Sequence, residues 1–125
     1  MRRARTLRPI WVVALVAVLL VTMAVGVRYH WDLTAAEERL TGRSRVIETP
    51  QGPLEYAEQG TGSPLLMIHG TGGGFDQGLL FSGDLHERGF RVIAPSRFGY
   101  LRSAPDPIAP DLQADAFATL LDELG

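Results

Sequence analysis

The 125-residue chain contains neither cysteine nor lysine. Without cysteine it has no disulfides, no thiolate nucleophile and no cysteine-ligated zinc or iron–sulfur centre. The three histidines, His30, His69 and His86, are widely separated and show no ligand spacing such as H-x-x-x-H. We therefore expect neither a metal site nor a cofactor.

Because lysine is absent, all 12 basic residues are arginines, and they are unevenly distributed. Residues 1–28 contain five arginines and no acidic residue, whereas residues 29–125 contain seven arginines and 14 acidic residues, a net charge of −7. Seven arginines dispersed among so many carboxylates do not make the basic surface that nucleic acid requires. We therefore expect no nucleic-acid partner.

Residues 10–27 form an uncharged run of 18 residues, most of them Val, Leu and Ala. As a helix rising about 1.5 Å per residue this run covers roughly 27 Å, close to the hydrocarbon thickness of a bilayer. We predict a transmembrane helix or signal anchor that binds the chain to a membrane. By the positive-inside rule, the basic residues 1–9 lie in the cytoplasm and the C-terminal domain lies outside it. A cleaved secretory signal is the alternative, because Ala24 and Gly26 are small residues at the spacing that signal peptidase recognises; the protein would then be secreted.

Residues 28–44 are predicted to be a spacer between the membrane and the following domain. Thr34 and Glu37 fit the S/T-x-x-E capping box, in which each side chain satisfies a free amide at the start of a helix. Gly42 offers a left-handed stop. A short helix is therefore expected to begin at Thr34.

Residues 45–125 have the pattern of an α/β domain. Residues 45–49 and 54–58 are predicted to be the strands of an antiparallel hairpin, joined by a turn over 50–53 that contains two prolines and a glycine. The wholly apolar run 65–68 predicts a strand covered on both faces, and such strands are usually parallel.

The order of the remaining elements indicates a right-handed strand–helix–strand unit followed by a helix. We predict a helix over 79–88, ended by Gly89, a strand over 90–94 and a proline-rich loop over 95–110. Asp111 is expected to cap the final helix. The apolar residues of that helix recur at helical spacing and predict one buried stripe: Phe117, Leu120, Leu121 and Leu124.

The most informative segment is the glycine-rich loop His69–Gly74, which follows the apolar strand directly. A phosphate-binding P-loop requires a lysine that this chain lacks. A dinucleotide fingerprint that starts at Gly70 would end at Phe75 instead of a glycine or alanine. The remaining interpretations are an oxyanion hole, in which backbone amides stabilise a developing negative charge, and a tight structural turn without a ligand.

The H-G-x-G-G-G sequence of this loop resembles the loop that follows the third strand in the α/β-hydrolase fold superfamily. The resemblance implies that the backbone amide of Thr71 donates to the oxyanion and that of Gly72 assists it. His69 and Gly70 are expected to hold the loop by hydrogen bonds. The implied fold is α/β, the N-terminal portion of an α/β-hydrolase sheet: a β-hairpin, then strand–helix–strand–helix, preceded by one transmembrane or signal helix.

A second resemblance covers residues 95–103, where members of this superfamily often have P-D-x-x-G-x-G-x-S. Pro95, Gly99 and Ser103 agree with that pattern. Ser96 stands in place of the aspartate and Leu101 in place of the second glycine, so we expect this loop to be shaped differently. Together the two resemblances extend over roughly residues 45–125.

The catalytic part of the superfamily pattern is missing. No serine lies in the G-x-S-x-G elbow that carries the nucleophile, and the base and the acid come from later parts of such chains. The sequence therefore predicts an N-terminal fragment of a membrane-anchored or exported hydrolase, inactive as this chain, whose full-length form acts on a small-molecule ester or other acyl substrate. The sheet order of the resembled superfamily implies that the strand at 65–68 lies between the strand at 90–94 and the missing elbow strand, which leaves it an exposed edge able to pair with another chain. The alternative is a small, membrane-tethered, non-catalytic binding or interaction protein.

Overall fold

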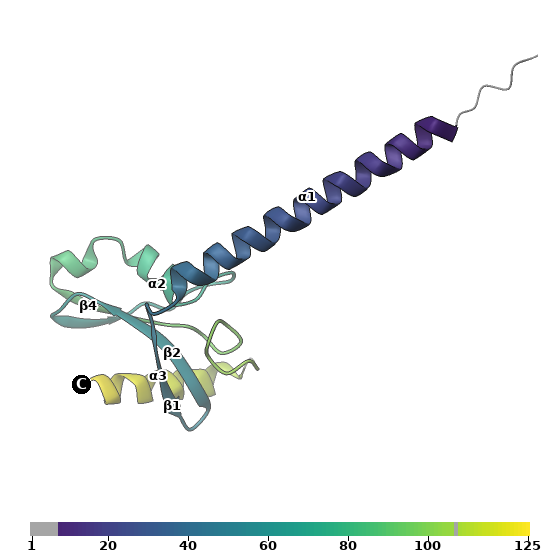
Figure 1. The fold of residues 1–125 in the computed structure, drawn as a ribbon. Helices are drawn as coiled ribbons and strands as arrows, with labels where there is room; N and C mark the ends of the chain where they lie inside the picture. Colours follow the sequence, from purple (N-terminus) through teal and green to yellow (C-terminus); the bar gives the residue numbers. More distant parts are fainter. Residues whose placement is uncertain (1–7, 107) are drawn as a thin grey trace, which may run out of the picture. The chain divides into compact units, whose positions relative to one another are not determined.

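The computed structural model describes residues 8–106 and 108–125 (Figure 1). The chain forms two compact units, residues 1–39 and residues 40–125. Arg2, Arg3 and Arg5 of the predicted cytoplasmic segment lie outside the described residues.

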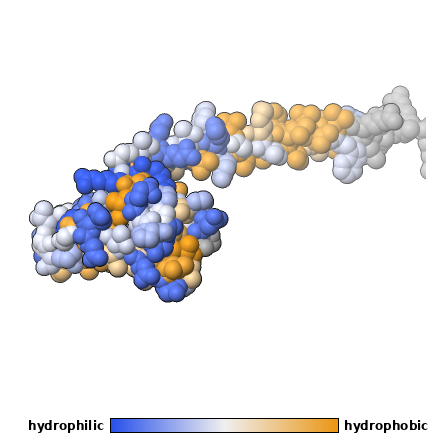
Figure 2. Space-filling view, turned by 90° about the horizontal axis from the view of Figure 1, so that it is seen from below, coloured by the Kyte–Doolittle hydropathy of each residue, from blue (hydrophilic) through white to orange (hydrophobic). Residues whose placement is uncertain are grey.

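Helix α1 (Arg8–Leu40) is one continuous helix of 33 residues. It contains a stretch long and apolar enough to cross a membrane, a property that signal sequences share. All its residues from 9 to 35 are exposed, and Figure 2 shows apolar side chains over the visible face of the part next to the grey residues. An apolar surface of this extent is unfavourable in water, which is the physical basis of the membrane prediction.

The predicted helix start at Thr34 is wrong. Thr34 lies inside α1, and its hydroxyl donates to the carbonyl of His30 at 3.0 Å. No glycine or proline occurs between Val27 and Leu40 to interrupt the helix, so the helix continues through the expected boundary. Gly42 has the predicted left-handed backbone, with φ of 75°.

The second unit is built on a four-stranded sheet with the order β1-β2-β4-β3. Strands β1 (Arg45–Thr49) and β2 (Gly52–Gln59) form the predicted antiparallel hairpin. Strand β4 (Phe90–Pro95) pairs antiparallel with β2 and parallel with β3 (Ser63–Leu66). Strand β3 therefore lies at the edge of the sheet, as the resemblance implied.

The hairpin and β3 differ in detail from their predictions. The turn contains two residues, Pro50 and Gln51, because β2 begins at Gly52 and not at Leu54. Strand β3 begins and ends two residues earlier than predicted, although the Met67 N–H still donates to β4 at 2.8 Å. The expected coverage of this strand on both faces is wrong, because its residues are exposed or half-buried at the edge of the sheet.

The helices also depart from their predicted bounds. Helix α2 (Phe75–Ser82) begins four residues before the predicted start at residue 79. Gly83 ends it, and the 3₁₀ helix η1 (Leu85–Arg88) follows, ended by Gly89 in the left-handed conformation. Helix α3 (Pro110–Leu124) has Ala109 at its N-cap, so the predicted cap at Asp111 is wrong. Pro110 occupies the first turn, where its missing N–H costs nothing.

The core lies on both faces of the sheet, and Figure 1 shows α2 and α3 on opposite sides of it. Helix α2 packs against β4 and β2, and α3 contacts β1. The stripe predicted on α3 is confirmed, because Phe117 and Leu120 are buried and Leu121 and Leu124 pack against them. Alternate residues of β2 and β4 enter the two clusters: Leu54, Tyr56 and Ile93 on the α3 side, and Ala57, Ala94 and the α2 residue Phe75 on the other.

Candidate functional site

The glycine loop connects β3 to α2, and its two ends are fixed by side chains of that helix. The Gly70 N–H donates to Gln77 Oε1 at 2.9 Å, and the Gly74 N–H donates to Asp76 Oδ1 at 3.0 Å. Between these anchors, none of the hydrogen bonds within residues 8–106 and 108–125 uses the N–H of Thr71 or Gly72. The two amides that the resemblance selected are therefore available as donors.

Glycine is favoured at positions 72, 73 and 74 for different structural reasons. Gly72 has φ of 89°, a backbone conformation that favours glycine, and a Cβ built there would meet open space. A Cβ at Gly73 would lie 2.5 Å from the Cβ of Gln77. A Cβ at Gly74 would overlap the side chain of Leu101 and lie 2.9 Å from Ser96 Oγ. Gly73 and Gly74 thus allow close packing, whereas at position 72 glycine is favoured by the positive φ alone.

His69 is buried, with 3% of its surface exposed, and both ring nitrogens are engaged. Nε2 accepts the Arg97 N–H at 2.9 Å, so the proton of the neutral ring resides on Nδ1, which donates to Gly70 O at 2.7 Å. The Tyr100 ring packs edge-on against the imidazole, with the centroids 4.7 Å apart. Burial lowers the pKa of His69, and the nearby Arg97 charge lowers it further, against the opposing effect of the Gly70 hydrogen bond. The His69 ring therefore connects the glycine loop to Arg97, and neither ring nitrogen is free to act as a base.

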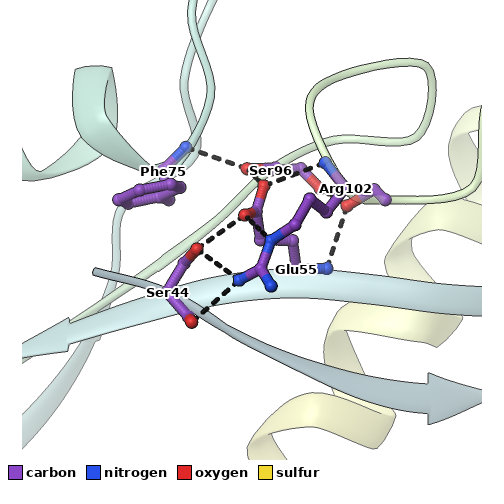
Figure 3. A network of polar contacts seen from close by, with 6 residues as sticks. Ser44, Glu55, Phe75, Ser96 and Arg102 are labelled. Atoms are coloured by element: carbon purple, nitrogen blue, oxygen red, sulfur yellow. Dashed lines mark hydrogen bonds and ion pairs between the residues drawn. The ribbon is translucent and has the colours of Figure 1, made fainter. Parts of the chain in front are cut away.

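A polar network centred on Glu55 lies beside the loop (Figure 3). This carboxylate on β2 is 2% exposed and accepts hydrogen bonds from Ser44 Oγ at 2.6 Å and Arg102 Nε at 2.8 Å. It also accepts the Ser96 hydroxyl at 2.9 Å and the Arg102 N–H at 3.2 Å. Burial alone would raise the pKa of Glu55, but these hydrogen bonds outweigh burial and the pKa lies below its ordinary value of 4.5. Glu55 is therefore a buried, charged and fully paired carboxylate.

Residues 96–104 form a compact loop beside the glycine loop. The Gly99 N–H donates to Ala104 O at 2.8 Å, and the Ser103 hydroxyl donates to Ser96 O at 2.6 Å. Leu101, which stands where the resembled pattern has a glycine, has φ of 47°. The backbone at Leu101 is therefore in the left-handed region despite the side chain, at a cost of roughly 1–2 kcal/mol.

The predicted site residues His69, Gly70, Thr71 and Gly72 are consecutive, and the structure adds partners that sequence reasoning missed. Glu55 was not singled out, although an acidic residue between Leu54 and Tyr56 in a buried strand is a signal that could have identified it. Phe75 and Phe98, which lie at or beside the two resembled loops, are buried and belong to the core.

The chain is similar to several known proteins. It is 42% identical over 73 residues to "Lipase 3" of Moraxella sp. (strain TA144), which covers 57% of this chain and 22% of the lipase. An α/β-hydrolase fold protein from Nakamurella multipartita superposes with a TM-score of 0.59 at 35% identity, covering 66% of this chain and 29% of that protein. An epoxide hydrolase from an endophytic Streptomyces superposes with a TM-score of 0.52 at 32% identity, covering 64% and 25%.

No family model matches the chain. The chain spans less than a third of the length of each of these relatives. Its sheet order, its parallel β3–β4 pair and the glycine loop that follows β3 agree with the α/β-hydrolase resemblance. In fold, the chain therefore corresponds to the N-terminal part of an α/β-hydrolase, the fold of the structures that it matches.

Proposed function

We propose that the chain supplies the oxyanion loop of a hydrolase that acts on an ester or a similar acyl substrate. The observation that carries this proposal is that, within residues 8–106 and 108–125, the amides of Thr71 and Gly72, like that of Gly73, have no hydrogen-bond acceptor, in a loop anchored at Gly70 and Gly74. Thr71 and Gly72 are both exposed, so their N–H groups are accessible to solvent and to a substrate oxygen. A catalytic loop keeps them free for the substrate oxygen.

The chemistry follows from what these amides can bind. When a nucleophile attacks an ester carbonyl, the carbonyl oxygen gains negative charge and becomes a stronger hydrogen-bond acceptor. Two N–H groups fixed before the reaction stabilise this charge without reorganising. Because residues 1–125 contain no G-x-S-x-G elbow, the proposal requires a nucleophile from outside this sequence, and the 125-residue chain alone is expected to be inactive.

The decisive experiment is to read the coding DNA past codon 125 in all three frames and to express the longest product. We expect a strand followed by G-x-S-x-G, and turnover of a p-nitrophenyl ester by the longer product but not by the 125-residue chain. Thr71→Pro, which removes the amide hydrogen, should lower kcat roughly 10²–10³-fold. Thr71→Val is the matched control, because it changes the side chain and retains the N–H. An active product insensitive to Thr71→Pro would exclude this oxyanion role.

The membrane part of the proposal concerns residues 10–27. We infer that they anchor the chain with its C-terminal domain outside the cytoplasm, supported by the length and exposure of α1. When membranes from cells that express the full chain are extracted with alkaline carbonate, the chain should stay in the membrane pellet. Protease added to the outside of spheroplasts should digest the C-terminal domain. Release of a shorter chain into the medium would instead indicate cleavage and secretion.

A second candidate function is that of a small binding protein, and it is favoured by the edge of the sheet. Within the described residues the outer edge of β3 has no strand partner. Beside it lies a cavity of about 400 Å³, lined mainly by apolar residues of β3 and α3, including Leu66, Leu121 and Leu124. A free edge beside an apolar cavity can accept an additional strand. A soluble, cooperatively folding product of residues 44–125 would favour this candidate, and an insoluble one would favour the hydrolase.

A further inference from the structure

The start of α2 is capped by a residue from elsewhere in the chain. Its N-cap, Gly74, makes no side-chain capping hydrogen bond. The first amide of the helix, that of Phe75, donates to Ser96 Oγ at 3.0 Å, a contact between residues 21 positions apart. The free N–H groups at the start of a helix carry partial positive charge and require acceptors. Ser96, which follows β4 directly, therefore supplies the acceptor that an N-cap side chain usually provides.

The direction of the Ser96 hydroxyl is determined by Glu55. A serine hydroxyl has one hydrogen, and that of Ser96 is given to Glu55 Oε2 at 2.9 Å. The oxygen of Ser96 therefore presents its lone pairs to the Phe75 N–H. Because Ser96 is fully buried and Glu55 is 2% exposed, water does not compete for either contact. The three groups form one directed chain: helix amide to hydroxyl, hydroxyl to carboxylate.

The carboxylate of Glu55 is itself held in place. Arg102 is half-exposed and donates to it from Nε, and the Ser44 hydroxyl donates to the same oxygen, Oε1. Oε2 is thus left for Ser96 and for the Arg102 backbone. In the resembled sequence pattern an aspartate stands at the position of Ser96. In this chain the carboxylate is instead on the neighbouring strand, and the serine connects it to the helix.

We propose that Glu55 and Ser96 form a capping relay that fixes the start of α2 and thereby positions the amides of Thr71 and Gly72. Glu55 is in this sense a positioning residue of the glycine loop. The consequence for catalysis rests on the proposed function. The relay itself does not rest on it, because its test measures the Phe75 amide at the start of α2 and needs no ester turnover.

The test is amide hydrogen exchange, followed by NMR, of the full ¹⁵N-labelled chain in detergent micelles. The readout is the exchange rate of the Phe75 amide relative to amides of the β1–β2 hairpin. Glu55→Gln keeps the shape of the side chain and removes its charge, and we expect it to accelerate Phe75 exchange about tenfold relative to the hairpin. The matched control is Glu58→Gln, because Glu58 lies on the same strand and pairs with Arg91 at 2.7 Å.

A second variant, which separates the relay from a general effect on stability, places a carboxylate at position 96, where the resembled pattern has an aspartate. Ser96→Asp alone places two carboxylates in contact and should accelerate Phe75 exchange. In the Glu55→Gln background the same substitution supplies the helix amide with a charged acceptor, and protection should return to within about threefold of the original chain. If Glu55 only stabilised the fold, Ser96→Asp would accelerate Phe75 exchange in both backgrounds.

Two results would overturn the relay. One is acceleration of Phe75 exchange by Glu55→Gln that is no greater than the acceleration at the hairpin. The other is a double variant as poorly protected as Ser96→Asp alone. If Glu55→Gln does not fold, Ser96→Ala is compared with Thr49→Val, which removes a buried hydroxyl that donates to Gly52 O in the hairpin and contacts neither Glu55 nor Ser96. Equal Phe75 exchange in those two variants would also reject the proposal.

Discussion

Acidification below pH 6.5 is expected to destabilise the domain through His69. The neutral ring accepts the Arg97 N–H at Nε2 and donates to Gly70 O from Nδ1. Protonation would place a second hydrogen against the Arg97 N–H and would bury a charge beside the Arg97 guanidinium. The folded state therefore binds this proton less readily than the unfolded chain does.

The sign and the upper limit follow from linkage. The pKa of His69 is lowered in the folded state from its ordinary value of 6.5. The stabilisation is fully present above pH 6.5 and is lost as the pH falls through the folded-state pKa. With one proton involved, the free energy of unfolding falls by at most about 1.4 kcal/mol for each pH unit in that window. Glu55, whose pKa is lowered from 4.5, adds its own loss only below pH 4.5.

The measurement is denaturant unfolding of the full chain in micelles at several values between pH 4.5 and 7.5. Both tryptophans, Trp11 and Trp31, lie in α1, so their fluorescence does not report on the domain; the near-ultraviolet circular dichroism of the buried Tyr56 does. His69→Gln retains a side-chain hydrogen-bond acceptor without titrating and should flatten the profile. A flat profile in the original chain, or an unchanged slope in His69→Gln, would refute the assignment.

Three further predictions concern stability, measured by the same unfolding assay. Gly78→Ala should destabilise by about 1–3 kcal/mol, because its Cβ would lie 2.7 Å from Met67 O and 2.9 Å from the Cβ of Ala94; an unchanged midpoint would mean that α2 is less closely packed than described. Leu101→Gly should stabilise by up to about 1 kcal/mol, because it relieves a left-handed backbone, and a loss of stability would contradict that strain. Leu120→Ala should cost about 2–5 kcal/mol, since Leu120 is fully buried, and a cost under 1 kcal/mol would place it outside the core.

The features that sequence predicted well depend on neighbours in the chain. The hairpin of β1 and β2 follows from two short strand segments on either side of a turn rich in proline and glycine, and the buried stripe of α3 follows from its helical period. The boundary errors have local causes as well. Helix α2 begins early because its first amide is capped by Ser96, which is distant in sequence, so no capping residue next to Phe75 marks the start.

The support of the candidate site could not be predicted in the same way. Glu55 contacts Ser96 and Arg102 across 41 and 47 residues of sequence. Nothing in the immediate sequence of Glu55 names those partners, because they meet only when β2 and β4 pair side by side. An acidic residue in a strand is equally compatible with an exposed position and with a buried, paired one.

The sequence by itself determined a long apolar segment, an α/β pattern and a glycine loop whose form selected Thr71 and Gly72, because composition and spacing act between residues that are close along the chain. Only the tertiary structure decided that these amides have no acceptor among the described residues, that His69 is engaged on both sides, and that a buried carboxylate caps α2 through a serine. Hydrogen-bond satisfaction and burial depend on which distant strands come together, and that pairing exists only in the folded domain.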